Sequence, residues 1–192
     1  MFQVRIHGRG GQGVVTAAEL LAQSAFDEEK FAQAFPSFGS ERTGAPVVAF
    51  CRIADVEIRV REPIMFPDAL IIQDSTLLRQ VDTFAGLKSD GYVLINSTRT
   101  CEQLGIADLA ERSSRFITIP ATAMAMEHLG RPVPNAVLLG AFAALTHIVS
   151  LNSVTDSLRK KFKQNIAESN CAAATAAYAY VNDLVGSHAQ TG

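Results

Sequence analysis

Short apolar runs separated by polar, glycine-containing stretches recur along the chain, and four of them are typical of buried strands. They cover residues 2–6, 69–73, 92–96 and 115–119. A short continuous apolar run bounded by turn residues indicates a strand covered on both faces, as in a parallel sheet. A fifth run, residues 31–35, alternates apolar and polar positions and is expected to form the second strand in chain order. This pattern predicts an open, mostly parallel α/β sheet.

Segments with helical spacing alternate with these strands. The predicted helices cover residues 14–22, 75–81, 121–129 and 136–147, with a final helical region from about 153 to about 185. The segment 136–147 has no polar face, which predicts burial on several sides. Ser153 and Asp156 are expected to cap the final region, whose apolar stripe is predicted to lie opposite a basic face. The alanine-rich stretch at 172–177 suits close helix packing.

An inserted hairpin is expected between the second strand and residues 69–73. Residues 47–53 and 56–60 both have strand character and flank Ala54 and Asp55. Charged residues alternate with valine and isoleucine through 56–60, so one face is in water or pairs with a partner. The complete fold prediction is an open, mostly parallel, Rossmann-like sheet with flanking helices, a β-hairpin insertion and C-terminal helices.

Composition limits the class of protein. The chain has 192 residues, 48% apolar content and a formal charge of −2, which predicts one domain over residues 1–186 and a flexible tail over 187–192. No basic field for nucleic acid is present. The apolar runs are too short to span a bilayer, so no membrane is expected. Because the chain begins with a strand rather than a basic leader, a cytoplasmic location is expected.

Metal and catalytic patterns are not found in the sequence. Cys51, Cys101 and Cys171 lie 50 and 70 residues apart, so no pair has the spacing of a cluster ligand or a redox motif. Each thiol is interpreted as a small hydrophobic residue, and the odd count suits a reducing compartment. Of the histidines, His7 lies where a ligand could bind, at the end of the first strand. A hydrogen bond from its side chain to a backbone group fits the sequence equally well. We assign no catalytic residue and no metal ligand.

A glycine-dense turn follows the first strand. Residues 8–13 contain four glycines and precede a predicted helix, an arrangement that can hold an anion at the helix N-terminus. The spacing matches the dinucleotide fingerprint, but residues 36–38 after the second strand contain no acid to hold a ribose. The phosphate-loop lysine is absent as well. A tight turn without a ligand and an anion site are therefore both left open.

A second loop is expected to open at the same end of the sheet. Residues 36–46 follow the second strand and are rich in glycine, proline and hydroxyl side chains. An arginine in such a loop can hold phosphate or carboxylate, although an ordinary exposed connection fits as well. Asp74 and residues 96–98 follow other strands, where each is interpreted first as a helix cap.

Four ordered motifs carry a resemblance to a known family. They are residues 8–19, 33–46, 73–78 and 129–141. Together they resemble the gamma subunit of the 2-oxoacid:ferredoxin oxidoreductases, the pyruvate synthase group, over nearly the whole chain. The resemblance implies a non-redox subunit, inactive alone, of an enzyme that decarboxylates a 2-oxoacid on thiamine diphosphate and transfers the acyl group to coenzyme A. Pyruvate is the first choice, with 2-oxoglutarate, branched-chain and aromatic 2-oxoacids such as phenylglyoxylate as alternatives.

The same resemblance places the cofactors elsewhere. Thiamine diphosphate, Mg²⁺, iron–sulfur clusters and coenzyme A are expected in the assembled complex, with none bound by this chain alone. The implied partners are alpha, beta and delta-type subunits, through which ferredoxin or another electron acceptor is contacted. Candidate contacts with the coenzyme A and thiamine crevice, or with a partner subunit, are Gly10, Gly11, Gln12, Gly13, Ser40, Glu41, Arg42 and Thr43. A stand-alone nucleotide-binding oxidoreductase and a purely structural adaptor are the alternatives.

Overall fold

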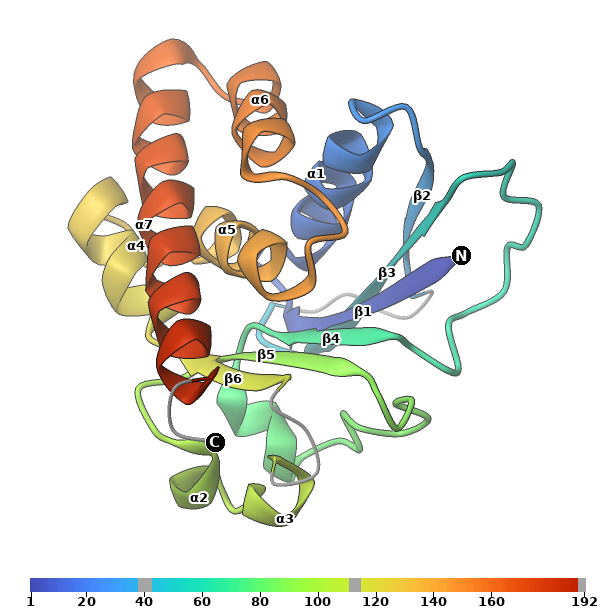
Figure 1. The fold of residues 1–192 in the computed structure, drawn as a ribbon, viewed down its shortest axis with the longest axis vertical. Helices are drawn as coiled ribbons and strands as arrows, with labels where there is room; N and C mark the ends of the chain where they lie inside the picture. Colours follow the sequence, from blue (N-terminus) through green and yellow to red (C-terminus); the bar gives the residue numbers. More distant parts are fainter. Residues whose placement is uncertain (38–42, 111–114, 190–192) are drawn as a thin grey trace.

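A single sheet forms the centre of the fold (Figure 1). Within residues 1–37, 43–110 and 115–189, which the computed structural model describes, six strands lie in the order β2-β3-β1-β4-β5-β6. Their bounds are β1 Phe2–Arg9, β2 Phe31–Pro36, β3 Pro46–Ala54, β4 Ala69–Ile72, β5 Tyr92–Asn96 and β6 Phe116–Ile119. The strands β1, β4, β5 and β6 run parallel, and β3 is antiparallel to both β1 and β2. The predicted open, mostly parallel α/β fold is confirmed.

The hairpin uses different strands from those predicted. Its partners are β2 and β3, with Phe31 opposite Ala54 and Phe35 opposite Phe50. The prediction that residues 56–60 supply its second strand is wrong, because these residues form no strand. A two-residue hairpin turn needs positive φ, which glycine or asparagine supplies and Ala54-Asp55 does not. Since β3 opposes both neighbours, β2 runs in the same direction as β1 and ends at the same edge of the sheet.

Helices cover the two faces of the sheet unequally (Figure 1). One face carries the larger helices, which are α1 Val14–Phe26, α4 Ala121–Leu129, α5 Asn135–Thr146, α6 Leu151–Lys161 and α7 Gln164–Ala189. The other face carries short elements, which are η1 Ser75–Arg79, α2 Cys101–Leu104 and α3 Ala107–Ala110. The sequence did not predict α2 and α3. Each has four residues, too few to show a helical period.

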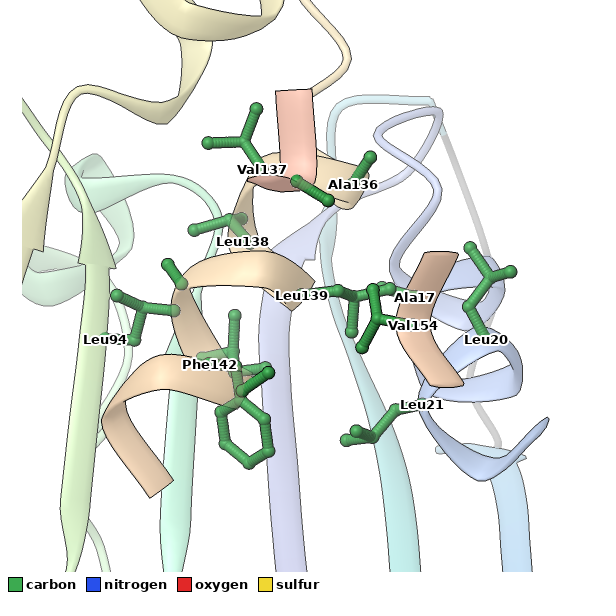
Figure 2. Close-up of a cluster of buried hydrophobic side chains, with 14 of the residues drawn as sticks. Ala17, Leu20, Leu21, Leu94, Ala136, Val137, Leu138, Leu139, Phe142 and Val154 are labelled. Atoms are coloured by element: carbon green, nitrogen blue, oxygen red, sulfur yellow. The ribbon is translucent and has the colours of Figure 1, made fainter. Parts of the chain in front are cut away.

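The main core lies between the sheet and α5. This helix is buried from Asn135 to Leu145, as its lack of a polar face predicts. Figure 2 shows Leu139 beside Ala17 of α1 and Val154 of α6 in the same apolar cluster. A smaller cluster on the opposite face includes Leu70 and Ile72, so β4 is buried on both faces.

Helix α7 packs closely on α5. A Cβ atom built on Gly140 would lie 2.1 Å from the carbonyl oxygen of Ala174, so the two backbones are nearly in contact. Ala173, Ala174 and Ala177 are fully buried, which confirms the predicted close packing of the alanine-rich stretch.

The final helical region is two helices rather than one. Helix α6 ends at Lys161 and α7 begins at Gln164, and Ile166, the last member of the predicted apolar stripe, is 43% exposed. The capping residue is Ser150, whose hydroxyl accepts from the Ser153 N–H over 3.1 Å, so the predicted cap at Ser153 and Asp156 is wrong.

Helix α7 continues past the predicted tail boundary at residue 186, and residues 190–192 lie outside the described part. The division into a domain and a tail therefore stays a prediction. Among the helices in the described residues, none combines the length and the hydropathy that a bilayer span requires.

Candidate functional site

The glycine turn connects β1 to α1 at the carboxyl edge of the sheet. Gly11 has φ +92° and Gly13 has φ +72°, values that side-chain-bearing residues rarely adopt. Gly13 is the N-cap residue of α1, so no side chain caps the first N–H groups of this helix. At Gly8 a Cβ atom would lie 2.5 Å from Cγ2 of Val14. Close packing requires glycine at position 8, while the turn geometry favours it at positions 11 and 13.

The second predicted loop meets this turn. The Gly10 N–H donates to the Ala45 carbonyl oxygen over 2.9 Å, and the Gly44 N–H donates to the Gly10 carbonyl oxygen over 3.0 Å. Thr43, which is exposed, forms a parallel bridge with Gly10. The expectation that the loop opens at the same end as the glycine turn is confirmed for residues 43–45. Three other candidates lie outside the described residues, namely Ser40, Glu41 and Arg42.

Arg9 joins three segments at this edge. Its Nε donates to Oδ2 of Asp74 over 2.9 Å, and its Nη1 donates to the Gly44 carbonyl oxygen over 3.0 Å. Its Nη2 donates to Oγ1 of Thr76 over 2.7 Å and to Oε1 of Gln80 over 3.0 Å. The guanidinium therefore links the end of β1 to the start of β3 and to η1. Arg9 has no local sequence signal that marks it, because its partners are distant in the chain.

Gln12 and Asp74 complete this network. The side-chain carbonyl of Gln12 accepts from the Arg9 N–H over 2.8 Å, and its amide donates to Asp74 over 3.2 Å. Asp74 also caps η1 by accepting from the Thr76 N–H over 3.0 Å, as its position after β4 indicated. Burial acts to raise the pKa of the Asp74 carboxyl, but hydrogen bonds from Thr76, Gln12 and Arg9 outweigh it and lower the pKa. Asp74 is therefore an ionised carboxylate whose hydrogen bonds stabilise the turn.

A chain of side-chain amides lies beneath the turn. The Gln73 amide donates to Oδ1 of Asn135 over 2.9 Å, and the Asn135 amide donates to the Gly13 carbonyl oxygen over 3.1 Å. Gln73 is 2% exposed, and its Oε1 has no hydrogen-bond partner among the described residues. Asn96 donates to the Gln73 carbonyl oxygen over 2.9 Å and to Oγ1 of Thr122 over 2.8 Å. These bonds fix β4, β5, α4 and α5 relative to α1.

His7 has a structural role. It is 5% exposed, its Nε2 accepts from Nε of Arg5 over 3.0 Å, and its carbonyl oxygen accepts from the Gln73 N–H over 2.8 Å. Burial, and then the nearby Arg5 charge, lowers the pKa of His7 to about 4. Within the described residues the imidazole contacts the Arg5 side chain, so its role is structural, but it is not the backbone-satisfying role that was expected.

The thiols show no activated environment. Cys51 and Cys171 are buried, and Cys101 is half-buried at the start of α2. Burial raises the pKa of the Cys51 thiol to about 12, so it stays protonated. Among the residues that the structure describes, no group of three histidine, cysteine or acidic side chains could hold a metal ion. The described groups at the turn can bind and orient a ligand or a partner, since they are amides, N–H groups and paired charges.

Comparison with known proteins assigns the family. The family model described as pyruvate ferredoxin/flavodoxin oxidoreductase matches residues 3–180. The chain is 47% identical to the pyruvate synthase subunit PorC of Methanothermobacter marburgensis over 178 residues, covering 93% of this chain and 96% of the relative. It is 44% identical to the pyruvate/ketoisovalerate oxidoreductases common subunit gamma of Thermococcus kodakarensis, with the same coverage of both chains.

A solved structure agrees with these relatives. The pyruvate oxidoreductase subunit PORC of Thermotoga maritima has a TM-score of 0.78 and 32% identity, and the match covers 93% of this chain and 95% of that one. The family resemblance expected from the four motifs is confirmed. The chain belongs to the pyruvate ferredoxin/flavodoxin oxidoreductase family and is the gamma subunit of a pyruvate or related 2-oxoacid oxidoreductase.

Proposed function

We propose that the glycine turn and residues 43–45 together form one wall of the crevice that receives coenzyme A, next to the thiamine-binding part of the assembled enzyme. The observation that carries this proposal is the pair of hydrogen bonds between Gly10 and residues 44 and 45, at 3.0 and 2.9 Å. These bonds bring the two predicted segments to one surface, at the carboxyl ends of β1 and β2. In open α/β sheets, ligands bind at this edge, where successive connections leave in opposite directions.

The chemistry of the surface suits a phosphorylated ligand. The first N–H groups of α1 receive no side-chain cap, and a helix N-terminus favours negative charge. No atom lies within 4 Å of the position that a Cβ atom would take on Gly11, so the turn is open on that side. The candidate contacts at this surface are Gly10, Gly11, Gln12, Gly13 and Thr43. The sequence pattern alone adds Ser40, Glu41 and Arg42.

The chain has a binding and positioning role in this proposal, with catalysis carried by other subunits. The ionised and titratable groups beside the turn have structural roles rather than catalytic ones, since Asp74 is paired with Arg9 and His7 is buried and neutral. Thiamine diphosphate, Mg²⁺ and iron–sulfur clusters are then held by alpha, beta and delta-type subunits, which also contact ferredoxin or another acceptor. Pyruvate is the first choice of substrate, supported by the names of the relatives.

A charge placed at Thr43 tests the proposal. In the reconstituted enzyme, Thr43→Glu should raise the apparent KM for coenzyme A several-fold, and added salt should reduce the effect by screening. The control is Asn152→Glu, which adds the same charge at an exposed position on α6, near the turn that follows α1. Arg42→Ala should raise the same KM, because an arginine in this loop can hold a phosphate group of the ligand.

The outcomes separate ligand contact from subunit docking. A raised KM in an intact complex supports the crevice assignment. An unchanged KM with weaker assembly of the Thr43→Glu subunit would instead make this surface a docking site for a partner. If neither the KM nor assembly changes, the proposal is wrong. Assay of the complex with a panel of 2-oxoacids identifies the substrate independently.

A further inference from the structure

The connection from β3 to β4 has a strand-like sequence but no strand partner. Residues 55–66 form no helix or strand, and within the described residues none of their backbone groups takes part in a backbone–backbone hydrogen bond. Figure 1 shows this teal segment projecting beyond the ends of the strands. A sequence pattern that disagrees with the local structure is a common sign of a functional surface.

Two buried arginines hold one edge of this segment. Arg52 is 1% exposed and donates to the carbonyl oxygens of Val60, over 3.4 Å, and of Glu62. Arg5 donates to the Ile64 carbonyl oxygen over 3.5 Å. The carbonyl oxygens of residues 60, 62 and 64 therefore point toward the protein. Residues 57–61 contain no turn or bend, and in a strand over these residues the backbone groups of 57, 59 and 61 point to the opposite side, away from the protein.

The charges of the segment are complementary to those of a second copy. From residue 55 onward the sequence is Asp55-Val56-Glu57-Ile58-Arg59-Val60-Arg61. Antiparallel pairing with Ile58 opposite its own copy places Glu57 opposite Arg59. The same register places Asp55 opposite Arg61. Every charge then faces an opposite charge, and such cross-strand pairs stabilise antiparallel strands.

The apolar positions and the free backbone edge fit the same register. Val56 falls opposite Val60, and these side chains are 71% and 42% exposed in the single chain. The outward-facing backbone groups of residues 57 and 59 become a hydrogen-bonded pair, and Ile58 becomes the non-hydrogen-bonded pair on the two-fold axis. Charge, apolar pattern and backbone direction thus agree on one register.

We propose that residues 55–61 pair antiparallel with the same segment of a second gamma chain, so that two copies of the enzyme's gamma subunit join through a two-stranded ribbon. The occupant is a second copy rather than a different subunit because the complementarity is of the segment with itself, acidic before Ile58 and basic after it. Glu57 and Arg59 already form an exposed ion pair at 3.0 Å within one chain, and the ribbon extends this pair into a ladder.

Two charge variants test the pairing. The double substitution Asp55→Lys with Glu57→Lys makes the segment wholly basic, and Arg59→Glu with Arg61→Glu makes it wholly acidic. Each variant alone should self-associate at least about tenfold more weakly than the unmodified chain, because like charges then face each other. An equal mixture of the two should associate as a heterodimer with affinity restored. Sedimentation equilibrium of the full chain over a concentration series to about 1 mM measures all four samples.

Cysteine cross-linking in the assembled enzyme tests the register. With Cys101→Ser as background, Ile58→Cys should oxidise to a disulfide between two gamma chains, since it faces its own copy. Val56→Cys and Val60→Cys should cross-link only when the two are mixed, which controls for random collision. Circular dichroism and thermal melting check that each variant is folded.

Each result decides the proposal. Association of either charge variant as strong as that of the unmodified chain overturns it. A disulfide from the Ile58→Cys variant to a different subunit overturns it in favour of a strand from that subunit. A monomeric chain that also gives no gamma-to-gamma disulfide in the complex overturns it. Restored association in the mixture, or the predicted disulfides in the complex, supports it.

Discussion

The side-chain amide of Asn135, the first residue of α5, donates to the carbonyl oxygen of Gly13, the N-cap residue of α1, over 3.1 Å. The same side chain accepts from the Gln73 amide over 2.9 Å. One residue thus joins three segments that are far apart in the sequence. Two of the motifs that suggested the family, residues 8–19 and 129–141, are held together by this contact.

Replacing Asn135 should loosen this junction. Asn135→Ala removes both hydrogen bonds and leaves the buried Gln73 amide without a partner, which should lower the free energy of unfolding by about 2 kcal/mol. Urea denaturation measures the change. Asn165→Ala, at an exposed position near the start of α7, is the control and should change stability by less than about 0.5 kcal/mol. A loss no larger at Asn135 than at Asn165 would contradict the role assigned to the amide chain.

Arg9 should control how firmly residues 43–45 are held to the glycine turn. Arg9→Lys keeps the charge but cannot reach all four of its acceptors, on Asp74, Gly44, Thr76 and Gln80. Amide hydrogen exchange at Gly10 and Gly44 should become about tenfold faster, with little change elsewhere. The exposed Arg131→Lys is the matched substitution and should leave both amides unaffected. Equal exchange in the two variants would show that the turn is held by its backbone bonds alone.

The contact between α5 and α7 should not accept a methyl group. In Gly140→Ala the new Cβ atom would lie 2.1 Å from the Ala174 carbonyl oxygen, so the helices must separate. We expect a loss of about 2 kcal/mol or more in the free energy of unfolding. Gly186→Ala, on α7 with open space around it, should instead stabilise the protein by about 0.5 to 1 kcal/mol. Calorimetric melting of both variants tests the opposite signs, and a stabilised Gly140→Ala variant would refute the packing argument.

Glu28 should make stability depend on pH in the acid range. Its carboxylate accepts from the Ser150 N–H over 2.6 Å, from the Ser153 hydroxyl over 2.6 Å and from Lys30 over 3.1 Å. Burial alone would raise the pKa of Glu28, but these hydrogen bonds outweigh it and lower the pKa from 4.5 to about 2. Because the unfolded chain takes up a proton at higher pH than the folded one, the stabilisation is complete above about pH 4.5 and is lost as the pH falls toward 2.

The variant Glu28→Gln should therefore lose about 1 to 2 kcal/mol at pH 7, with the difference from the unmodified protein shrinking as the pH approaches 2. Denaturant unfolding at several pH values provides the measurement. Glu127→Gln, at an exposed position on α4, is the control. A loss in Glu28→Gln that is independent of pH would mean that the carboxylate charge is not what stabilises the start of α6.

The pattern of apolar and polar residues located most of the strands and helices, but it did not predict which strands pair with each other. The apolar runs located β1, β4, β5 and β6 to within a few residues, because β4 and the middle of β1 and β5 are buried on both faces and β6 is buried on one. The partner of β3 was missed because strand pairing depends on turn chemistry and on long-range contacts that alternation does not encode. The break at residue 162 was missed because the four-residue spacing of apolar side chains continues through it.

The position of the candidate site could be predicted from the sequence, but the side-chain hydrogen bonds that hold it together could not. The glycines identified the turn, and the common direction of β1 and β2 brought residues 43–45 to it. Arg9, Gln73 and Asn135 hold this region together through side chains that reach across it, and their partners lie 35 to 122 residues away. Such reach depends on the folded backbone, so no local sequence signal identifies it.

Because α5 is synthesised before α7, the contact between Gly140 and Ala174 can form only late in translation. Helix α5 covers the sheet, and α7, which follows it in the chain, covers α5. A nascent chain that has released α5 but not α7 therefore has an alanine-rich helical surface still in water, with the second layer missing. Completion of the core must wait until Val181 has left the ribosome, since it is the last fully buried residue of α7 among those whose burial the structure describes. A gamma subunit can present its finished surface to the other subunits only after that point.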